Sequence, residues 1–347
     1  MQRKLASIQR VLEIIPIEGA DAIEAVRING WQCVVKKNAF SVGDRGVFFE
    51  IDAIPPDLPA FRFLWASKGD TPTEGSRPAN FRIRTRKMRG CMSQGLFISL
   101  GETGLPEDVV EGEDVTERLG VTKYDPPLPT GSPRMGLTRG SFPRAVPRTD
   151  EERVQSAPAV LDELRGHPYV ATLKCDGTSS TYLINPDDGT FHACGRNWSI
   201  TDGDNLYWNI AHRYNLEEGL RRLGGNLAIQ GEICGPGIQK NPLGLRENDF
   251  FLFSVYNMET RRHLSDPELR EVALQLGVKP VPIVEAGDSF NHTTASLLSL
   301  AEGKYEGTKN EREGIVIRPL TPMYSPTLQG HLSFKAISNR YLLNEKD

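Results

Sequence analysis

The sequence predicts an α+β protein of two domains, a small β-barrel followed by a larger domain of antiparallel sheets and helices. Three observations lead to this prediction. Residues 1–125 carry short apolar stretches separated by Gly-rich turns, residues 126–148 are rich in proline and glycine, and residues 149–347 mix strand and helix patterns. A chain of 347 residues is long enough for two domains, each with its own core.

The first domain is expected to contain a β-hairpin near its start. Ala25–Ile28 and Trp31–Val35 flank Asn29 and Gly30, a pair that tolerates positive φ angles and favours a two-residue turn. A second turn rich in glycine leads into the apolar stretch Val47–Ile51. Short strands with such turns and little helix predict a small closed barrel of the OB-fold type, although an SH3-like barrel would give a similar pattern.

Beyond the barrel, the sequence predicts a linker and then a mixed domain. Residues 126–148 hold six prolines and three glycines, which favour a semi-extended chain. Further on, Ser265 to Glu268 form a helix-capping pattern, apolar residues follow at helical spacing, and Gly277 ends the helix. A second helix is predicted at 204–223. Strands are predicted at Tyr169–Leu173, Ser180–Ile184, Leu227–Gln230, Phe250–Val255 and Ile315–Arg318.

Composition and charge exclude several classes of protein. No apolar run reaches the roughly 18 residues of a membrane span, and the N-terminus lacks the apolar core of a signal peptide, so a cytoplasmic location is expected. The five cysteines form no CxxC pair, which argues against a disulfide framework or a zinc site. The net charge is −4, so a site for a polyanion is expected to be a local basic patch.

Lys174 is the candidate nucleophile. The apolar stretch Tyr169–Leu173 delivers this lysine into a tight turn at Asp176 and Gly177, where a rigid strand end can hold an amine beside a phosphate. Partial burial or a nearby cation would lower the pKa of the amine and supply its neutral form. The alternative is a surface lysine beside a hairpin turn, and Lys-x-Asp-Gly alone does not separate the two.

Five further candidate residues follow in order along the second domain. They are Arg196 after a strand, Glu232 and Glu313 beside apolar stretches, Phe253 in an aromatic strand, and Lys335 late in the chain. Taken singly, Phe253 could be a core residue and Lys335 could cap a strand. Arg196 and Glu232 could simply pair with each other. Their occurrence together and in this order is what indicates a function.

This order of motifs resembles the covalent nucleotidyltransferases, the superfamily of ATP-dependent DNA and RNA ligases and mRNA capping enzymes. The resemblance covers roughly residues 150–345. It implies that Lys174 attacks the α-phosphate of ATP, expels pyrophosphate and carries AMP covalently, a step governed by positioning and charge stabilisation. It also implies roles for the other residues. Asp176 and Gly177 orient the nucleotide, Arg196 and Lys335 contact phosphates, Glu232 binds the ribose, Phe253 stacks on adenine, and Glu313 with Asp176 binds Mg²⁺ or Mn²⁺.

One position departs from the superfamily pattern. Ligases of this type usually carry Lys-x-Lys in the last motif, whereas Ile337 stands at the second lysine position after Lys335. The missing charge leaves one phosphate contact without its usual residue. Arg318 or Arg340 is a candidate to replace it.

Within the superfamily, the domain order resembles the Deinococcus-type RNA ligases. DNA ligases and capping enzymes typically place an OB domain after the last motif, whereas here twelve residues follow Lys335 and the barrel comes first. The stretches Arg82–Gly90, Ser93–Leu96 and Thr149–Gln155 also look like this family. The resemblance implies an RNA repair ligase that seals 3′-OH/5′-phosphate nicks in duplexes with RNA on the 3′-OH side, through lysyl-AMP and an adenylylated 5′-phosphate.

A basic stretch in the first domain is the candidate nucleic-acid contact. Arg82, Arg84 and Arg86 alternate, so a strand would place them on one face, and Lys87 and Arg89 follow. A cationic strand face suits a phosphate backbone. The alternative is an edge strand whose charges prevent aggregation.

The expected partners are ATP and an RNA or RNA–DNA duplex with a nick, and a monomer is expected. Two alternatives within the same chemistry stay open, an ATP-dependent DNA ligase and a capping-type guanylyltransferase. A third, from another class, is a non-catalytic RNA-binding protein that retains a ligase domain, and Ile337 is its only support.

Overall fold

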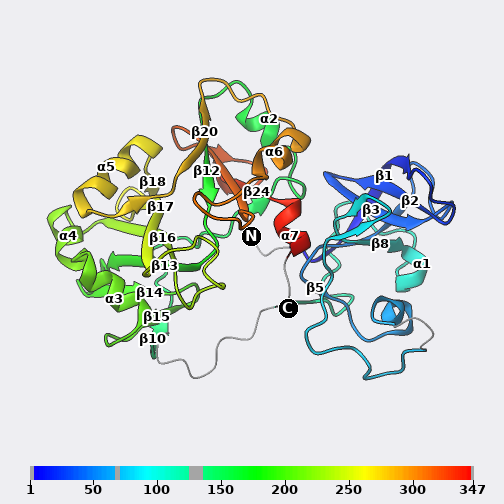
Figure 1. Ribbon diagram of the computed structural model, residues 1–347, viewed down its shortest axis with the longest axis horizontal. Coiled ribbons are helices and arrows are strands. Elements are labelled where there is room, and N and C mark those ends of the chain that lie inside the picture. Colours follow the sequence, from blue (N-terminus) through cyan, green and yellow to red (C-terminus); the bar gives the residue numbers. More distant parts are fainter. Residues whose placement is uncertain (1–3, 67–70, 125–135, 345–347) are drawn as a thin grey trace. The chain divides into compact units, whose positions relative to one another are not determined.

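The computed structural model describes residues 4–66, 71–124 and 136–344 (Figure 1). Contacts within the chain divide these residues into two compact units. The first unit holds the described residues before 125 together with 342–344, and the second holds 136–341. Each unit has hydrophobic cores of its own.

The first unit is built on a five-stranded antiparallel sheet in the order β3-β2-β1-β4-β8. The long β1 pairs with β4 through Ala6–Arg10 and with β2 through Val11–Pro16, and its register shifts between Val11 and Glu13. A bulge of this kind bends a strand, so β1 carries the sheet around a curve, as expected for an OB-type barrel. The strands are β1 (Ala6–Pro16), β2 (Ile23–Ile28), β3 (Trp31–Lys36), β4 (Arg45–Phe49) and β8 (Leu96–Ser99).

Strand β4 has both faces buried. Val47 and Phe49 face one apolar cluster together with Phe61, whereas Phe48 faces the other together with Trp31. An uninterrupted apolar stretch is the pattern that such a strand requires. The predicted strand-rich first domain is therefore confirmed. Its smaller elements are η1 (Pro59–Leu64), α1 (Leu100–Thr103) and the paired short strands β5 (Ala53–Ile54) and β9 (Thr122–Lys123).

Two hairpins of this unit turn at residues with positive φ. The predicted hairpin is confirmed, because β2 and β3 pair across a two-residue turn in which Asn29 has a φ of 50°. The second hairpin joins β6 (Arg86–Met88) to β7 (Cys91–Ser93) through Arg89 and Gly90, with φ of 49° and 82°. Arg86, Lys87 and Arg89 are exposed on this hairpin.

Arg82 does not belong to that basic surface. The prediction that Arg82, Arg84 and Arg86 share one strand face is wrong, because the strand begins only at Arg86. Arg82 is buried, its Nε lies 3.2 Å from Asp52 Oδ1, and its guanidinium lies over the Tyr124 ring, 4.2 Å from the centroid. A buried guanidinium needs such partners, so this arginine supports the fold of the unit.

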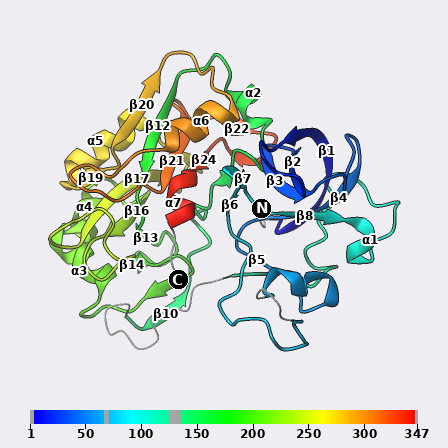
Figure 2. The same ribbon diagram turned by 45° about the vertical axis from the view of Figure 1, so that its right-hand side comes forward.

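The second unit contains two large, mainly antiparallel sheets (Figures 1 and 2). All five strands predicted for this region are confirmed, with longer bounds, as β12, β13, β16, β17 and β21. The larger sheet has the order β10 (Thr138–Ser141), β15 (Trp198–Ile200), β14 (Phe191–Cys194), β13 (Thr178–Ile184), β16 (Leu227–Cys234), β17 (Asp249–Asn257) and β18 (Arg262–His263), with β19 (Lys279–Pro280) beside β17. The smaller sheet has the order β11 (Glu152–Arg153), β24 (Phe334–Ile337), β21 (Gly314–Pro319), β12 (Tyr169–Lys174) and β20 (Ile283–Gly287). A separate pair is β22 (Tyr324–Ser325) with β23 (Gly330–His331).

The helices after residue 136 are α2 (Val160–Leu164), α3 (Leu206–Arg213), α4 (Leu216–Arg222), α5 (Asp266–Leu276), α6 (Thr294–Ala301) and α7 (Asn339–Asn344). The predicted capped helix is confirmed as α5, with a capping box between Ser265 and Glu268 and a left-handed Gly277. The single helix predicted at 204–223 is wrong, because Asn215 is left-handed and separates α3 from α4. Across the described ranges, no helix has the length and apolar character to cross a membrane.

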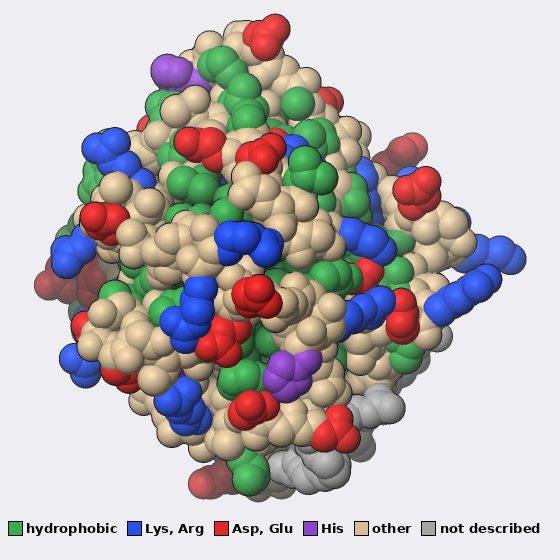
Figure 3. All heavy atoms as spheres, turned by 90° about the vertical axis from the view of Figure 1, so that its left-hand side faces the viewer, with side chains coloured by type: hydrophobic (Ala, Val, Ile, Leu, Met, Phe, Trp, Pro, Cys, Tyr) green, Lys and Arg blue, Asp and Glu red, His purple; other side chains and the backbone are tan. Residues whose placement is uncertain are grey.

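Charges of both signs cover the surface of the second unit. In the face drawn in Figure 3, Lys and Arg side chains lie among Asp and Glu side chains. Arg221 pairs with Glu217 on α4, and Arg270 pairs with Asp266 on α5, each at 2.7 Å. This mixture accompanies the net charge of −4 and leaves recognition of a polyanion to local patches.

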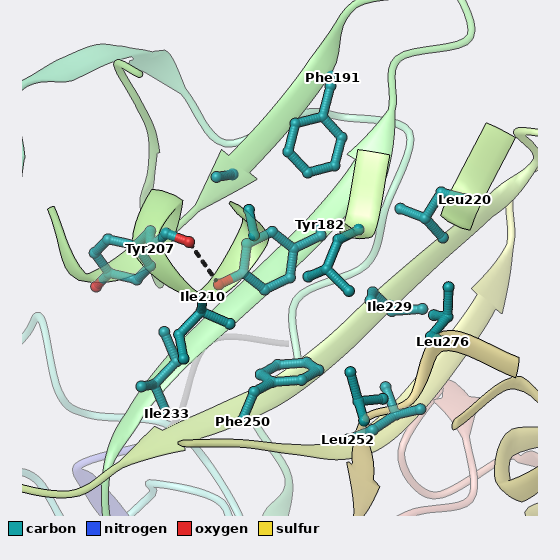
Figure 4. Close-up of a cluster of buried hydrophobic side chains, with 14 of the residues drawn as sticks. Tyr182, Phe191, Tyr207, Ile210, Leu220, Ile229, Ile233, Phe250, Leu252 and Leu276 are labelled. Atoms are coloured by element: carbon teal, nitrogen blue, oxygen red, sulfur yellow. Dashed lines mark hydrogen bonds between the residues drawn. The ribbon is translucent and has the colours of Figure 1, made fainter. Parts of the chain in front are cut away.

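One face of the larger sheet is covered by α3, α4 and α5. Side chains such as Tyr182, Ile229 and Phe250 point from the sheet toward this cover and form the largest core (Figure 4). Because side chains alternate along a strand, the neighbouring residues of β13, β16 and β17 face the other way. That opposite face carries the candidate residues Glu232 and Phe253.

The smaller sheet is divided in the same way. Tyr169 and Ala171 of β12 pack with Ile315 and Ile317 of β21 against α2 and α6. The alternating residues of these strands, which include Thr172, lie on the opposite face, away from α2 and α6. The two sheets therefore each keep one face for the core and one for the site.

The predicted linker at 126–148 is described only from residue 136, and residues 126–135 lie outside the described ranges. From Thr138 the chain forms β10, which pairs with β15 at the edge of the larger sheet. The backbone of this segment is thus part of the second unit. Gln230 Nε2 also donates to the carbonyl of Pro147 at 2.9 Å, which fixes the segment further along.

Candidate active site

Lys174 lies where the chain crosses from the smaller sheet to the larger one. It is the last residue of β12, and the chain enters β13 after Cys175, Asp176 and Gly177. Glycine is required in this turn, because a Cβ at position 177 would lie 2.3 Å from the carbonyl oxygen of Ile233. The turn therefore holds the lysine at the junction of the two sheets.

Glu313 contacts Lys174 directly. Strand β21 pairs with β12, and its first residue, Gly314, lies opposite Lys174. Glu313 precedes that residue, and its Oε1 lies 2.7 Å from Lys174 Nζ. The lysine side chain is 25% exposed and the glutamate side chain 17%, so both are partly withdrawn from water. The predicted nucleophile and the predicted metal ligand are thus an ion pair.

The pKa of Lys174 is not lowered, so that part of the prediction is wrong. Burial lowers the pKa of Lys174, but the negative charges of Glu313, Glu232 and Asp176 outweigh burial and raise it above its ordinary value. Burial also raises the pKa of Glu232 to about 8, against the opposing charge of Lys174 and with added repulsion from Glu313 and Asp176. Three carboxyl groups therefore crowd around one ammonium group.

Glu232 and Phe253 approach the junction from the larger sheet. Glu232 on β16 lies opposite Ser179 of β13, two residues beyond the turn that follows Lys174. Ile229 and Ile233 of the same strand face the helices, so Glu232 faces the opposite side. Phe253 on β17 packs on that side, with the cluster that contains Cys175.

A small cavity between the sheets lies beside Phe253. Its walls come from both sheets and from the segment before β20, and they include Val170, Thr172, Phe253, Val281 and Arg318. Val170, Thr172 and Lys174 alternate on β12 and share one face, so the cavity and the lysine are on the same side of the smaller sheet. Phe253 gives this cavity an aromatic wall, and polar side chains such as Asp266 and Arg318 also line it.

Lys335 lies on the same face of the smaller sheet as Lys174. It is opposite Val316 on β21, which is opposite Thr172 on β12. Directly opposite residues of an antiparallel pair share a face, so these three side chains form one row. The next row along the sheet contains Lys174.

Ile337 occupies that next row. It lies opposite Gly314, which is opposite Lys174. Ile337 is 3% exposed, so an apolar side chain lies beside Lys174 at the position where a second lysine was expected. Gly314 between them has no side chain, and a Cβ there would lie 2.2 Å from the carbonyl oxygen of Ala336.

Both arginines suggested as substitutes for that lysine have protein partners, and a phosphate contact by either one stays a prediction. Arg318 donates to the carbonyl of Phe253 at 2.8 Å and to Glu151 at 2.7 Å. Arg340 lies on α7, with its Nε 3.4 Å from Glu302. Both guanidinium groups are engaged with other partners.

Arg196 lies in the turn between β14 and β15. It pairs with Asp150 at 2.7 Å, and both side chains are more than half exposed. Gly195 packs closely on Tyr207, whose hydroxyl lies 3.4 Å from Thr178 Oγ1 at the start of β13. The turn is therefore close to the segment that follows Lys174, and the phosphate contact of Arg196 stays a prediction.

Two tyrosines of the site were missed by sequence reasoning. The Tyr305 hydroxyl donates to the carbonyl of Lys174 at 3.1 Å and accepts from the N–H groups of Asp176 at 3.1 Å and Glu313 at 3.2 Å. The Tyr341 hydroxyl donates to Asp176 Oδ2 at 2.8 Å. Neither tyrosine lies in a recognisable motif, so no local pattern could have found them.

The carboxylates of the junction fit a hard divalent cation that is held mostly by other ligands. Within the described ranges, no group of three or more His, Cys, Asp or Glu side chains is arranged to hold a metal ion by itself. Glu313 and Asp176 would supply oxygen ligands to such a cation, and the excess negative charge that raises the pKa of Lys174 favours a cation. Mg²⁺ commonly binds through one or two carboxylates, with water and phosphate oxygens completing its shell.

Family models define the class of this protein. A model described as an OB-fold domain matches residues 5–100, and a model described as RNA ligase matches residues 167–337. Together with the solved structures below, these matches show that the chain belongs to the RNA ligase family, with an OB-fold domain before the ligase domain.

Solved structures of the RNA ligase of Naegleria gruberi are similar over almost the whole chain. A mutant with ATP and Mn is 40% identical, with 98% of each chain covered and a TM-score of 0.86. Another mutant with ATP and Mn covers 99% of this chain and 100% of that chain at 40% identity, with a TM-score of 0.87. The same ligase with PPi is 40% identical over 98% of each chain, with a TM-score of 0.85. No match was found among curated proteins.

Proposed function

We propose that this protein is an ATP-dependent RNA ligase that joins 3′-OH and 5′-phosphate ends and carries AMP on Lys174. The observation that carries the proposal is the Lys174–Glu313 ion pair at the junction of the two sheets. Glu232 and Asp176 lie close enough to influence the same amine. The N. gruberi ligase structures with ATP, AMP, Mn and PPi support the choice of nucleotide and metal.

The chemistry consists of three transfers. Lys174 Nζ attacks the α-phosphorus of ATP, an N–P bond forms, and the bond to pyrophosphate breaks. An oxygen of the 5′-phosphate end then takes AMP from the lysine. Finally the 3′-OH oxygen attacks the adenylylated phosphate and releases AMP. Because its pKa is raised, Lys174 must lose a proton before the first transfer, and that loss becomes easier when the surrounding carboxylate charge is neutralised.

The other residues bind and orient the nucleotide. Phe253 stacks on the base beside the cavity, and Glu232 accepts a hydrogen bond from a ribose hydroxyl. Lys335 and Arg196 contact phosphate oxygens, in line with the position of Lys335 on the face of the nucleophile. Glu313 and Asp176 would hold Mg²⁺ or Mn²⁺, which supplies positive charge against the phosphates.

The proposed substrate is a nick in a duplex with RNA on the 3′-OH side, and the proposed role is RNA repair. A local basic surface for the duplex is available on the β6–β7 hairpin, where Arg86, Lys87 and Arg89 are exposed. Arg84 adjoins this surface, whereas Arg82 is withdrawn into the fold. The cytoplasmic location and the monomeric state stay predictions from the sequence.

Incubation with α-labelled ATP and Mn²⁺ or Mg²⁺ tests the nucleophile. We expect an acid-labile label on the wild-type chain and none on Lys174→Ala. Lys279→Ala is the matched control, because Lys279 is a lysine of the same unit that pairs with Asp249 at 2.7 Å away from the junction. Undiminished labelling of Lys174→Ala would refute the assignment. A wild-type chain that binds RNA but takes no label would favour a non-catalytic protein.

A series of nicks and nucleotides tests the substrate. Preference for GTP over ATP would indicate a capping-type enzyme. Nicks that differ only in whether the 3′-OH strand ends in RNA or DNA separate the two ligase types, and we expect sealing to require RNA at that end. Equal sealing of an all-DNA nick would contradict the RNA assignment.

A further inference from the structure

Tyr305 lies outside every motif, yet its hydroxyl is bonded to three residues of the proposed site. It donates to the Lys174 carbonyl and accepts from the N–H groups of Asp176 and Glu313, all within 3.1–3.2 Å. The side chain is 3% exposed, so these three bonds are shielded from water. A hydroxyl has one donor and two acceptor positions, and all of them are used here.

The hydroxyl acts at the point where a sheet ladder ends. Lys174 and Gly314 are the last pair of the β12–β21 ladder. Beyond this pair the backbone turns toward Asp176 on one side and toward Glu313 on the other, so no further strand pairing is available to join the two segments. The Tyr305 hydroxyl joins the two segments instead. It hydrogen-bonds to the carbonyl of Lys174 and the N–H group of Asp176 on one segment, and to the N–H group of Glu313 on the other.

Tyr305 is itself held in a braced loop. Its N–H donates to the carbonyl of Asn310 at 3.1 Å, and its carbonyl accepts from Thr308. In the same loop, Arg312 donates from its guanidinium to carbonyls at the end of α6, including that of Ala301 at 3.1 Å. A hydroxyl fixed in this way can define the positions of the groups that it binds.

We propose that Tyr305 is a positioning residue for adenylylation, whose hydroxyl keeps the amine of Lys174 and the carboxylate of Glu313 at their working distance. The proposal rests on the proposed function of the site and adds a residue to it. Tyr305 acts through the backbone and does not contact the reacting atoms. The amine that it positions is faced by Glu313, Glu232 and Asp176, and Lys335 lies on the same face of the sheet.

The test compares Tyr305→Phe with Tyr182→Phe in the full-length protein. Tyr182 is fully buried in the large core, and its hydroxyl donates to the carbonyl of Tyr207 at 3.0 Å (Figure 4). Both variants remove one buried hydroxyl and keep the ring, so each measures the loss of such a group, one at the junction and one away from it. Single-turnover labelling with α-labelled ATP gives the adenylylation rate, and titration with ATP gives its affinity.

We expect Tyr305→Phe to slow adenylylation about tenfold to hundredfold, because two N–H groups and a carbonyl lose their partner. ATP affinity should change by less than about threefold, since the base and ribose contacts are untouched. Tyr182→Phe should leave the adenylylation rate and the ATP affinity unchanged.

Two results would overturn the proposal. One is a Tyr305→Phe variant with the wild-type adenylylation rate. The other is an equal slowing in Tyr182→Phe, which would mean that any buried hydroxyl has the same effect. If the wild-type chain takes no label at all, the proposed function fails instead, so the two failures are distinguishable.

Discussion

The residues of the junction are arranged for a ligand more than for stability. Glu313, Glu232 and Asp176 all act on the amine of Lys174, in partly buried surroundings. Withdrawing an unbalanced carboxylate from water costs free energy, which appears here as a pKa of Glu232 of about 8. A bound cation or a proton would relieve the imbalance.

Replacement of Glu232 by Gln should therefore stabilise the protein without nucleotide, and more so at higher pH. The folded protein binds an extra proton between the ordinary pKa of the group, 4.5, and its raised value of about 8. The free energy of unfolding of the wild-type chain consequently falls as pH rises through this window. Glutamine does not titrate, so Glu232→Gln should gain about 1–3 kcal/mol at pH 8 and almost nothing near pH 5.

Urea unfolding of both chains from pH 5 to pH 8.5 measures this difference. Asp162→Asn is a suitable control, because Asp162 is an exposed carboxylate that pairs with Arg165 on the surface. A difference between Glu232→Gln and the wild-type chain that stays constant with pH would contradict the raised pKa. Labelling with ATP should meanwhile weaken in Glu232→Gln, because an amide binds the ribose hydroxyl less strongly than a carboxylate does.

At the scale of elements, the β2–β3 and β6–β7 hairpins of the first unit have different roles. The β2–β3 hairpin belongs to the curved sheet, whereas the β6–β7 hairpin presents Arg86, Lys87 and Arg89 to solvent. Exposed cations contribute little to stability but bind phosphates through release of counterions. Hairpin β6–β7 is therefore expected to affect RNA affinity and not folding.

Changing Arg86, Lys87 and Arg89 together to Ala should weaken binding of a nicked duplex and reduce its dependence on salt. The slope of log affinity against log salt should fall by about 2–3, close to one for each phosphate that is no longer neutralised. The matched control replaces Arg10, Arg27 and Arg118 with Ala. These substitutions remove the same charge, but the three arginines are already paired with carboxylates. Equal weakening by both triple variants would show a general charge effect and contradict a binding hairpin.

The elements themselves were partly predictable, and the reasons for failure are local. Helix α5 carries its own start and stop signals at Ser265 and Gly277, so its local sequence was sufficient to predict the helix and both of its ends. The helix predicted at 204–223 breaks at Asn215 because this residue is left-handed. The helical spacing of the residues around it gives no sign of the break. The alternation of arginines after residue 82 suggested a strand, but burial of Arg82 against Asp52 and Tyr124 overrides that pattern.

At the scale of the molecule, two units with separate cores should unfold as two transitions. ATP with Mg²⁺ should raise only the transition of the second unit, because the candidate site lies entirely within it. At a ligand concentration of 100 times Kd the gain is about 2.7 kcal/mol, or roughly 5–10 °C for a unit of this size. The calorimetry uses the Lys174→Ala variant, which cannot bond covalently to AMP, so the measured shift reports reversible binding of ATP. A shift of both transitions, or a single transition that includes the first unit, would contradict this expectation.

The site was predictable where chemistry imposes a motif and not where geometry alone does. Lys174, Glu232 and Glu313 lie at positions whose residue types and order are distinctive. Tyr305 and Tyr341 contribute hydroxyls to backbone or carboxylate groups over 100 positions away. Such contacts leave no local spacing, and only the folded chain places them at the junction.

This long-range assembly has a consequence for biosynthesis. Lys174 emerges early from the ribosome, but its partner Glu313 and the hydroxyl of Tyr341, which is 165 positions beyond Asp176, come much later. A nascent chain that has completed only β12 and β13 holds Lys174 without the groups that fix it. The protein should therefore become able to take up AMP only once synthesis has passed Tyr341, so a shorter nascent chain does not capture nucleotide.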